Sequence, residues 1–271
     1  MVKKFMRFAL IYSKKYPVGF KVAKRFKEIA FMPQIPVIEL KKEVLFTNII
    51  KNIFLELKNI DFIVFLSVHK SKDNKPSLCL HAPGNLRNAN FGGKEGKVCM
   101  TSAFIMKYLF QRLNYFAQEN EIVKERYNVS LEATHHGPLT NIPCCFLEIG
   151  STDEEYNDVN AIGVVVKTII SLQNYKINYS WIPAIAIGGP HYAPNFNKIQ
   201  LNSNYAISHI IPNYSLPLTE SMLTEAEAKT LEHVKNVLID WKGCGSSEER
   251  SKYFTLIEKL GFEIKRTDKV K

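Results

Sequence analysis

The 271-residue sequence has no apolar run long enough to span a bilayer. Its longest candidates, Ile60–Val68 and Trp181–Ile187, have strand length, whereas a transmembrane helix needs about 18–20 apolar residues. The early apolar stretch Phe8–Tyr12 is followed at once by Lys14 and Lys15. It is shorter than the roughly 7–15 residues of a signal-peptide core. We therefore expect a cytoplasmic protein with no membrane partner.

Cysteine is scarce, and its spacing excludes two kinds of site. The chain has five cysteines and no Cys-x-x-Cys pair. An odd number without a regular pattern argues against a disulfide framework, and the missing pair argues against a thiolate zinc site. Cys144 and Cys145 lie in an apolar run, so we expect them to be small core residues.

Several nucleotide and hydrolase motifs are also missing. The sequence contains no Gly-x-x-x-x-Gly-Lys loop, no Gly-x-Gly-x-x-Gly after its first expected strand and no Gly-x-Ser-x-Gly elbow. These absences disfavour ATP, NAD and the serine nucleophile of α/β-hydrolases.

Charge is abundant and unevenly distributed. The formal net charge is +10, and residues 1–30 hold nine basic residues and one acid. Residues 128–166 hold six acids and no Lys or Arg. The basic segment fits either a polyanionic partner such as RNA or an ordinary lysine-rich surface. Much of the acidic stretch follows Thr152 with capping-box spacing, which indicates a helix start.

Expected strands and helices alternate along the chain. The strands cover Arg7–Tyr12, Pro36–Leu40, Phe62–Val68, Ser77–His81, Val129–Thr134, Pro143–Ile149, Trp181–Ile187 and Tyr205–Ile211. The helices cover Pro17–Ile29, Ile49–Leu57, Thr101–Asn120, Asp153–Leu172, Leu223–Trp241 and Ser247–Leu260. Alternation with solidly apolar strands predicts a three-layer α/β sandwich with a mixed, mostly parallel central sheet. We expect one domain over residues 1–271.

Polar residues follow the expected strands where each strand ends. Six of the seven histidines lie there, and only His233 falls in an expected helix. Because ligands bind beyond the carboxyl ends of strands in open α/β sheets, these histidines predict a clustered site. They are His69, His81, His135, His136, His191 and His209.

Two further arrangements are open to two interpretations each. If residues 130–136 are extended, Glu132 and His136 share a face, so Glu132 either orients His136 or is a buried acid bonded to the backbone. Gly188-Gly189 and Gly150 indicate close approach to the backbone. Main-chain N–H groups there, or at the helix start Ser151-Thr152, could bind an anion or a developing oxyanion.

Six motifs in this order resemble those of the D-aminoacyl-tRNA deacylases of archaea and plants. They are His81-Ala82-Pro83-Gly84-Asn85, Glu132-Ala133-Thr134-His135-His136-Gly137-Pro138, Glu148-Ile149-Gly150-Ser151-Thr152, Gly188-Gly189 with His191-Tyr192-Ala193-Pro194, His209-Ile210-Ile211-Pro212 and Asp240-Trp241-Lys242-Gly243. The resemblance runs from the first strand to about Arg250. Leu86 and Asn213 depart from it, because an aromatic and a basic residue are expected there.

The resemblance implies hydrolysis of the ester that joins a D-amino acid to the 3′-terminal ribose of tRNA. It also implies broad tolerance of amino acids and tRNAs, removal of mischarged tRNA and two bound zinc ions. The implied fold is similar to those of peptidyl-tRNA hydrolases and purine nucleoside phosphorylases. We expect a monomer that binds D-aminoacyl-tRNA and not DNA.

The candidate site residues follow from these motifs. We assign catalysis to Glu132, His135, His136 and His191, and metal binding to His81, His135, His136 and His191, since neutral imidazole serves as base or zinc ligand. Substrate-binding candidates are His81, Asn85, Glu148, Ser151, Thr152, Gly188, Gly189, Tyr192, His209 and Lys242. Lys242 and the basic segment would contact phosphates, and Tyr192 either stacks on the terminal adenine or packs beneath the loop.

Two other functions remain open. The first is a different hydrolase or a nucleoside phosphorylase on the same fold, which fold alone does not exclude. The second is a non-catalytic RNA-binding module, which would explain the basic segment but not the histidines at the strand ends.

Overall fold

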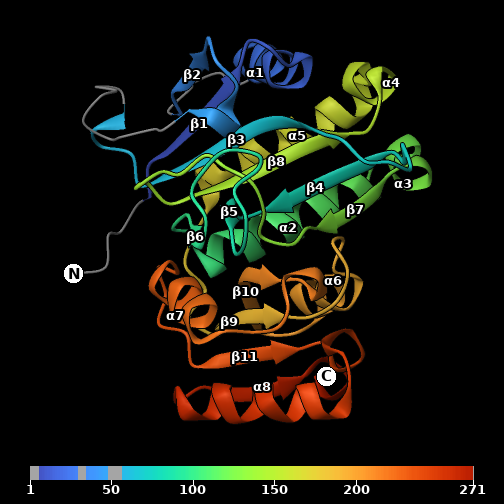
Figure 1. The fold of residues 1–271 in the computed structure, drawn as a ribbon. Helices are drawn as coiled ribbons and strands as arrows, with labels where there is room; N and C mark the ends of the chain where they lie inside the picture. Colours follow the sequence, from blue (N-terminus) through green and yellow to red (C-terminus); the bar gives the residue numbers. More distant parts are fainter. Residues whose placement is uncertain (1–5, 30–34, 48–56, 271) are drawn as a thin grey trace.

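The structure, a computed structural model, describes residues 6–29, 35–47 and 57–270. Two sheets lie one above the other in Figure 1, with the N-terminal part of the chain in the upper sheet and the C-terminal part in the lower one. The upper sheet has the order β2-β1-β3-β8-β4-β7. The lower sheet has the order β10-β9-β11-β12, and all of its strands are parallel. No helix in the described part of the chain is long and apolar enough to cross a membrane.

The strands are short and largely apolar, as buried strands are. Their bounds are β1 Phe8–Ser13, β2 Val37–Leu40, β3 Phe62–His69, β4 Ser77–His81, β5 Gly84–Asn85, β6 Lys97–Val98, β7 Asn128–Leu131, β8 Cys144–Gly150, β9 Ile182–Ile187, β10 Tyr205–Ile211, β11 Asn236–Ile239 and β12 Glu263–Arg266.

The helices cover the sheets and fill the space between them. Their bounds are α1 Pro17–Ile29, α2 Ala103–Gln118, α3 Glu121–Arg126, α4 Asp153–Asn157, α5 Val159–Ser171, α6 Pro194–Asn202, α7 Glu220–Ala228 and α8 Ser247–Lys259. Single 3₁₀ turns cover Val44–Phe46, Leu172–Asn174, Asn213–Ser215, Trp241–Cys244 and Thr267–Lys269.

Helix α2 connects the two sheets. It contacts β4 and β7 of the upper sheet and β10 of the lower sheet. Its apolar stripe, with Ile105, Leu109 and Leu113, is fully buried in the core shared by α1, α5 and the upper strands. A second core lies under α7 and α8, and the opposite face of the upper sheet carries a third.

The predicted fold class is confirmed, because the chain is α/β and the upper sheet is mixed but mostly parallel. Cys144 and Cys145 are core residues as predicted, and all five cysteines are free and buried. The division of the strands between two large sheets and the two-stranded β5-β6 sheet was not predicted. The helix expected at Ile49–Leu57 lies almost wholly outside the described residues.

Two of the expected helices differ from the structure. The helix expected over Leu223–Trp241 is wrong, because α7 ends at Ala228 and residues 236–239 form β11 between β9 and β12. His233 therefore precedes a strand and is exposed. The single helix expected over Asp153–Leu172 is two helices, since Asp158 ends α4 and caps α5 by accepting from the N–H of Asn160.

Candidate functional site

The site is built on one face of the upper sheet. In a strand, alternate side chains share a face, so His69 of β3, His81 of β4 and Glu148 of β8 all stand opposite the α2 side. Strand β4 runs antiparallel to β8, with His81 beside Phe146 and Ser77 beside Gly150. The expected position of the cluster, beyond the carboxyl ends of the strands, is therefore only partly correct, because the side chains meet across the face of the sheet.

Two loops complete the cluster. The segment after β4 holds the segment after β7, because the N–H of Gly84 donates to the carbonyls of His135 and His136. The segment after β9 comes from the lower sheet and contacts the segment after β7. The N–H of Ala133 donates to the carbonyl of His191 at 2.8 Å. Stretches far apart in the sequence thus bring their histidines to one place.

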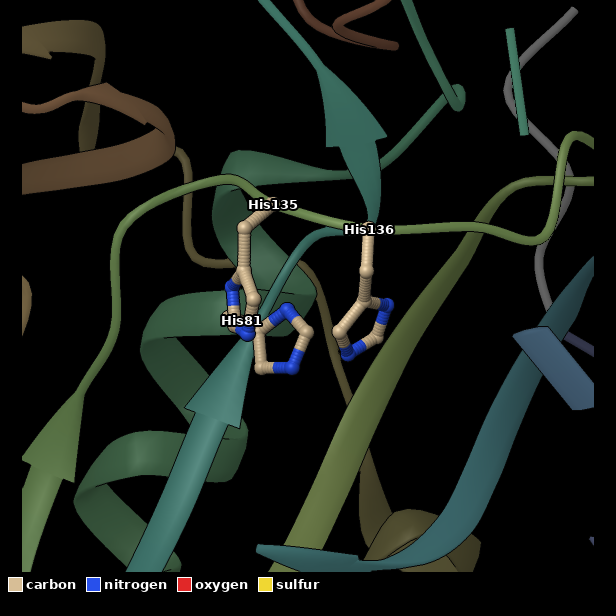
Figure 2. Close-up of side chains that lie close together, drawn as sticks. All are labelled: His81, His135 and His136. Carbon is tan, nitrogen blue, oxygen red and sulfur yellow. The ribbon is translucent and has the colours of Figure 1, made fainter. Parts of the chain in front are cut away.

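Three imidazole rings face one another in the centre of the site, as Figure 2 shows for His81, His135 and His136. One nitrogen of each lies within 4.8 Å of the other two. Each ring donates its Nδ1–H to a main-chain carbonyl, at 3.2 Å for His81, 2.8 Å for His135 and 2.6 Å for His136. These bonds leave Nε2 as the atom that carries the lone pair when the ring is neutral. Phe146 supports the cluster, stacked on His81 at 5.2 Å between ring centroids.

Burial sets the charge of two of these rings, whereas for His81 the lowering of the pKa by burial is outweighed by Glu148 and Glu132, which raise it. It lowers the pKa of His136 to about 4, and neighbouring His81 adds to that effect. Burial and the nearby rings of His81 and His136 lower the pKa of His135 well below its usual range. Both rings are therefore neutral at pH 7 and can act as bases or metal ligands.

Glu132 is the acidic centre of the cluster. Its Oε1 lies 3.0 Å from Nδ1 of His69 and 3.3 Å from Nε2 of His191, and its Oε2 lies 3.8 Å from Nε2 of His81. Burial would raise its pKa, but contacts with His191 and His69 hold the pKa well below the usual range. The side chain is fully buried and carries a negative charge.

His69 is the positive partner of that carboxylate. Burial lowers its pKa, but the contacts with Glu132 and Glu148 outweigh burial and raise the pKa to about 11. The ring is therefore an imidazolium at neutral pH, and its Nε2–H donates to the Tyr192 hydroxyl at 2.8 Å. His191 is partly exposed at the edge of the cluster, where its Nδ1 hydrogen bonds with the Tyr214 hydroxyl at 2.9 Å.

The buried polar atoms of this cluster fit a metal ion. His81 Nε2 and both carboxylate oxygens of Glu132 are buried and make no hydrogen bond with good geometry. Four overlapping groups have the spacing of a metal site: His81 with His135 and His136, Glu132 with His135 and His191, His81 with Glu132 and Glu148, and His69 with Cys79 and Glu132. Imidazole and carboxylate are donors that divalent transition metals accept.

The structure thus brings together six predicted site residues: His81, Glu132, His135, His136, Glu148 and His191. Tyr192 contacts this group through the hydrogen bond between its hydroxyl and His69. Glu132 does not orient His136, because β7 ends at Leu131 and His136 has a φ of 45°, so the extended alternation breaks. His136 bonds the carbonyl of Gly137 instead.

Three of the expected oxyanion donors, the N–H groups of Ser151, Thr152 and Gly188, are already engaged. The N–H groups of Ser151 and Thr152 donate to the Glu155 carboxylate at 3.2 and 2.8 Å, which completes the capping box of the five-residue α4. Gly188 donates its N–H to Ile211. The glycine pair is required because the 240–245 turn packs on it, and a Cβ on Gly188 would lie 2.6 Å from Cys244 Sγ.

Three other candidates lie outside the cluster. His209 is buried between the Thr134 hydroxyl and the carbonyl of Lys229, and burial lowers its pKa to about 4. The Asn85 amide donates to Gly92 and holds the 91–93 loop. Lys242 is exposed on a turn of the lower sheet.

Sequence reasoning gave no role to three residues that the structure places here. His69 carried a signal, since it follows an apolar strand as the other histidines do. Cys79 and Tyr214 carried none, because only the strand register and the hydrogen bond to His191 reveal them.

Known proteins identify the family. The family model described as D-aminoacyl-tRNA deacylase matches residues 56–265. The chain belongs to the D-aminoacyl-tRNA deacylase family. The predicted resemblance is confirmed, and with it the prediction of an ester hydrolase.

Relatives match over most of their length. The chain is 32% identical to a D-aminoacyl-tRNA deacylase of Methanocaldococcus jannaschii over 96% of this chain and 100% of that protein. It is 37% identical to the one of Thermococcus kodakarensis over 76% and 74%. A crystal structure titled as a conserved protein of unknown function has a TM-score of 0.86 at 25% identity, covering 98% of this chain and 96% of that one.

Proposed function

We propose that this protein hydrolyses the ester between a D-amino acid and the 3′-terminal ribose of tRNA, releasing both. The observation that carries the proposal is the cluster of two partly buried, neutral imidazoles, His135 and His136, beside the buried Glu132 carboxylate and the His69 imidazolium. Family membership supports the substrate. A phosphorylase or a passive RNA-binding module would leave this arrangement of charges unexplained.

The reaction needs few groups, because an aminoacyl ester is already activated. An attacking water must lose a proton, and a neutral imidazole whose Nδ1–H is bound to the backbone can accept that proton at Nε2. His135 and His136 both meet this requirement. Glu132 and His69 hold opposite charges in the water-poor interior, where fixed charges stabilise a transition state most strongly. His191, the partly exposed member, lies where the ester would enter.

We also propose that the site holds zinc, and two ions per chain are our expectation from the family. Either His81, His135 and His136 or Glu132, His135 and His191 would hold an ion, because the single free nitrogen of His135 binds one ion only. The second set leaves Nε2 of His136 free to act as the base. A bound ion would supply Lewis-acid polarisation of the ester carbonyl and lower the pKa of a bound water. Elemental analysis of the purified protein, with His81→Ala as the comparison, tests this proposal.

The finer aspects of the function follow the same proposal. We propose broad tolerance of amino acids and tRNAs, a role in removing mischarged tRNA and a cytoplasmic location, where aminoacyl-tRNA is made and used. We also propose that the protein acts as a monomer.

Incubation with D-tyrosyl-tRNA and L-tyrosyl-tRNA tests the activity. We expect release of tyrosine from the D-form at a rate at least tenfold above that from the L-form. Release from neither substrate, by protein with its full metal content, would overturn the proposal.

A further inference from the structure

A basic groove runs from the histidine cluster along the lower sheet. Three adjoining hollows of about 610, 450 and 460 Å³ form it. Lys242 lines both the first and the second hollow, and Arg266 lines both the second and the third. Tyr214 lines the first hollow and hydrogen bonds with His191 at 2.9 Å, so the groove begins at the site.

Three of the five cations that line this groove have no acidic partner in the described part of the chain. Among the described residues no carboxylate lies within 4.0 Å of the ammonium groups of Lys198, Lys242 or Lys269. The other two cations, Lys265 and Arg266, pair with Glu263 and Asp268. The three acids that line the groove each have a partner. Asp240 accepts from Asn195, Glu249 accepts from the N–H of Ser246, and Asp268 pairs with Arg266.

The groove is held rigidly against the site. The turn after β11 packs on the end of β9, where a Cβ on Gly243 would lie 2.2 Å from the nitrogen of Gly189. The guanidinium groups of Arg250 and Arg266 lie 4.5 and 4.1 Å from the ring of Trp241. The position of Lys242 relative to His191 is thus fixed by packing.

We propose that this groove binds the sugar–phosphate backbone of the single-stranded 3′ end of the tRNA. The inference rests on the proposed function and names the surface that delivers the ester to it. Unpaired lysines that track a groove match a phosphate backbone, and an exposed tyrosine at its end suits stacking of an unpaired base. Tyr214, which is 59% exposed, is the residue in that position.

The test uses the full-length enzyme and two substrates. In the variant Lys198→Ala/Lys242→Ala/Lys269→Ala we expect the KM for D-tyrosyl-tRNA to rise about tenfold or more. We expect kcat/KM for D-tyrosyl-adenosine, which carries the ester without the tRNA phosphates, to change less than twofold. The salt dependence of tRNA affinity should fall by about 2 in log–log slope, since each lost single-strand phosphate contact contributes about 0.7.

A matched control removes the same charge elsewhere. Lys72→Ala/Lys167→Ala/Lys235→Ala also loses three exposed lysines, none of which lines this groove, and should match the parent on both substrates. Equal effects of the two triple variants would overturn the proposal, as would equal loss on both substrates in the groove variant. If the parent hydrolyses neither substrate, the proposed function fails. The groove then stands only if uncharged tRNA binds about tenfold more weakly to the groove variant than to the control.

Discussion

Replacing Tyr192 by phenylalanine separates two roles for this residue. The substitution keeps the aromatic ring and removes one hydroxyl, which accepts a hydrogen bond from His69 Nε2 at 2.8 Å. If the ring served only to stack on the terminal adenine, phenylalanine would replace it without loss. If the hydroxyl fixes His69, and through His69 the Glu132 carboxylate at 3.0 Å, activity must fall.

The magnitude follows from the surroundings of His69. Its side chain is 4% exposed, so the freed Nε2–H has little access to water. An unsatisfied buried donor costs about 1–3 kcal/mol, and we take about 1–2 kcal/mol because Tyr192 itself is partly exposed. If about 1.4 kcal/mol of this cost raises the activation free energy by misplacing the His69–Glu132 pair, kcat falls about tenfold.

The assay compares Tyr192→Phe with Tyr108→Phe. The Tyr108 hydroxyl donates to the Ser171 carbonyl at 2.7 Å between α2 and α5, remote from the site. Urea unfolding should show both variants destabilised by about 1 kcal/mol, while only Tyr192→Phe loses about tenfold in kcat on D-tyrosyl-tRNA. Full activity of Tyr192→Phe would refute the positioning argument, and equal kinetic loss in both variants would show a general effect of stability.

Three further outcomes follow from the structure. Burial lowers the pKa of Lys107 to about 8, so between pH 8 and 10.5 this ammonium group keeps its proton in the unfolded chain and loses it in the folded one. The unfolding free energy of the wild type, compared with that of Lys107→Met, should therefore rise by about 2 kcal/mol from pH 7.5 to pH 10. A flat difference between the two urea series would contradict this. Gly188→Ala should lose about 1–3 kcal/mol of unfolding free energy, because φ at this position is 89° and the new Cβ would meet the sulfur atom of Cys244. Gly163→Ala in α5, where a Cβ has open space, should gain up to about 1 kcal/mol. The reverse order of urea midpoints would contradict the packing argument. Glu155→Gln should lose about 1 kcal/mol of unfolding free energy and keep kcat within twofold, since its carboxylate caps α4 and pairs with Arg126, away from the histidine cluster. A large fall in kcat would show that the N–H group of Thr152 takes part in the reaction.

Long apolar runs made much of the fold predictable. Strand Phe62–His69 and strand Cys144–Gly150 are buried throughout, and the length of such apolar runs favours a strand over a helix. The helix predicted from Leu223 to Trp241 was wrong because Val234, Leu238 and Trp241 have helical spacing by coincidence. Pairing with β9 and β12 makes residues 236–239 a strand, and sequence alone does not show that pairing.

The members of the site were more predictable than their partners. The histidines that follow apolar strands indicated the cluster, because a residue at the end of a buried strand is held in place by the sheet whichever strands are its neighbours. The partners depend on the antiparallel β4 and on the left-handed φ of His136, and both are tertiary features. For that reason Glu132 pairs with His69 and His191, and not with the residue four positions later on its own segment.

The central claim is that the clustered neutral imidazoles of His135 and His136 perform the hydrolysis. Single-turnover hydrolysis of D-tyrosyl-tRNA by His136→Ala, with affinity for uncharged tRNA measured in parallel, tests it most directly. The account predicts a loss of at least about 100-fold in rate with affinity unchanged within twofold. A variant that turns over at the parental rate, or one that loses affinity and rate together, would contradict it.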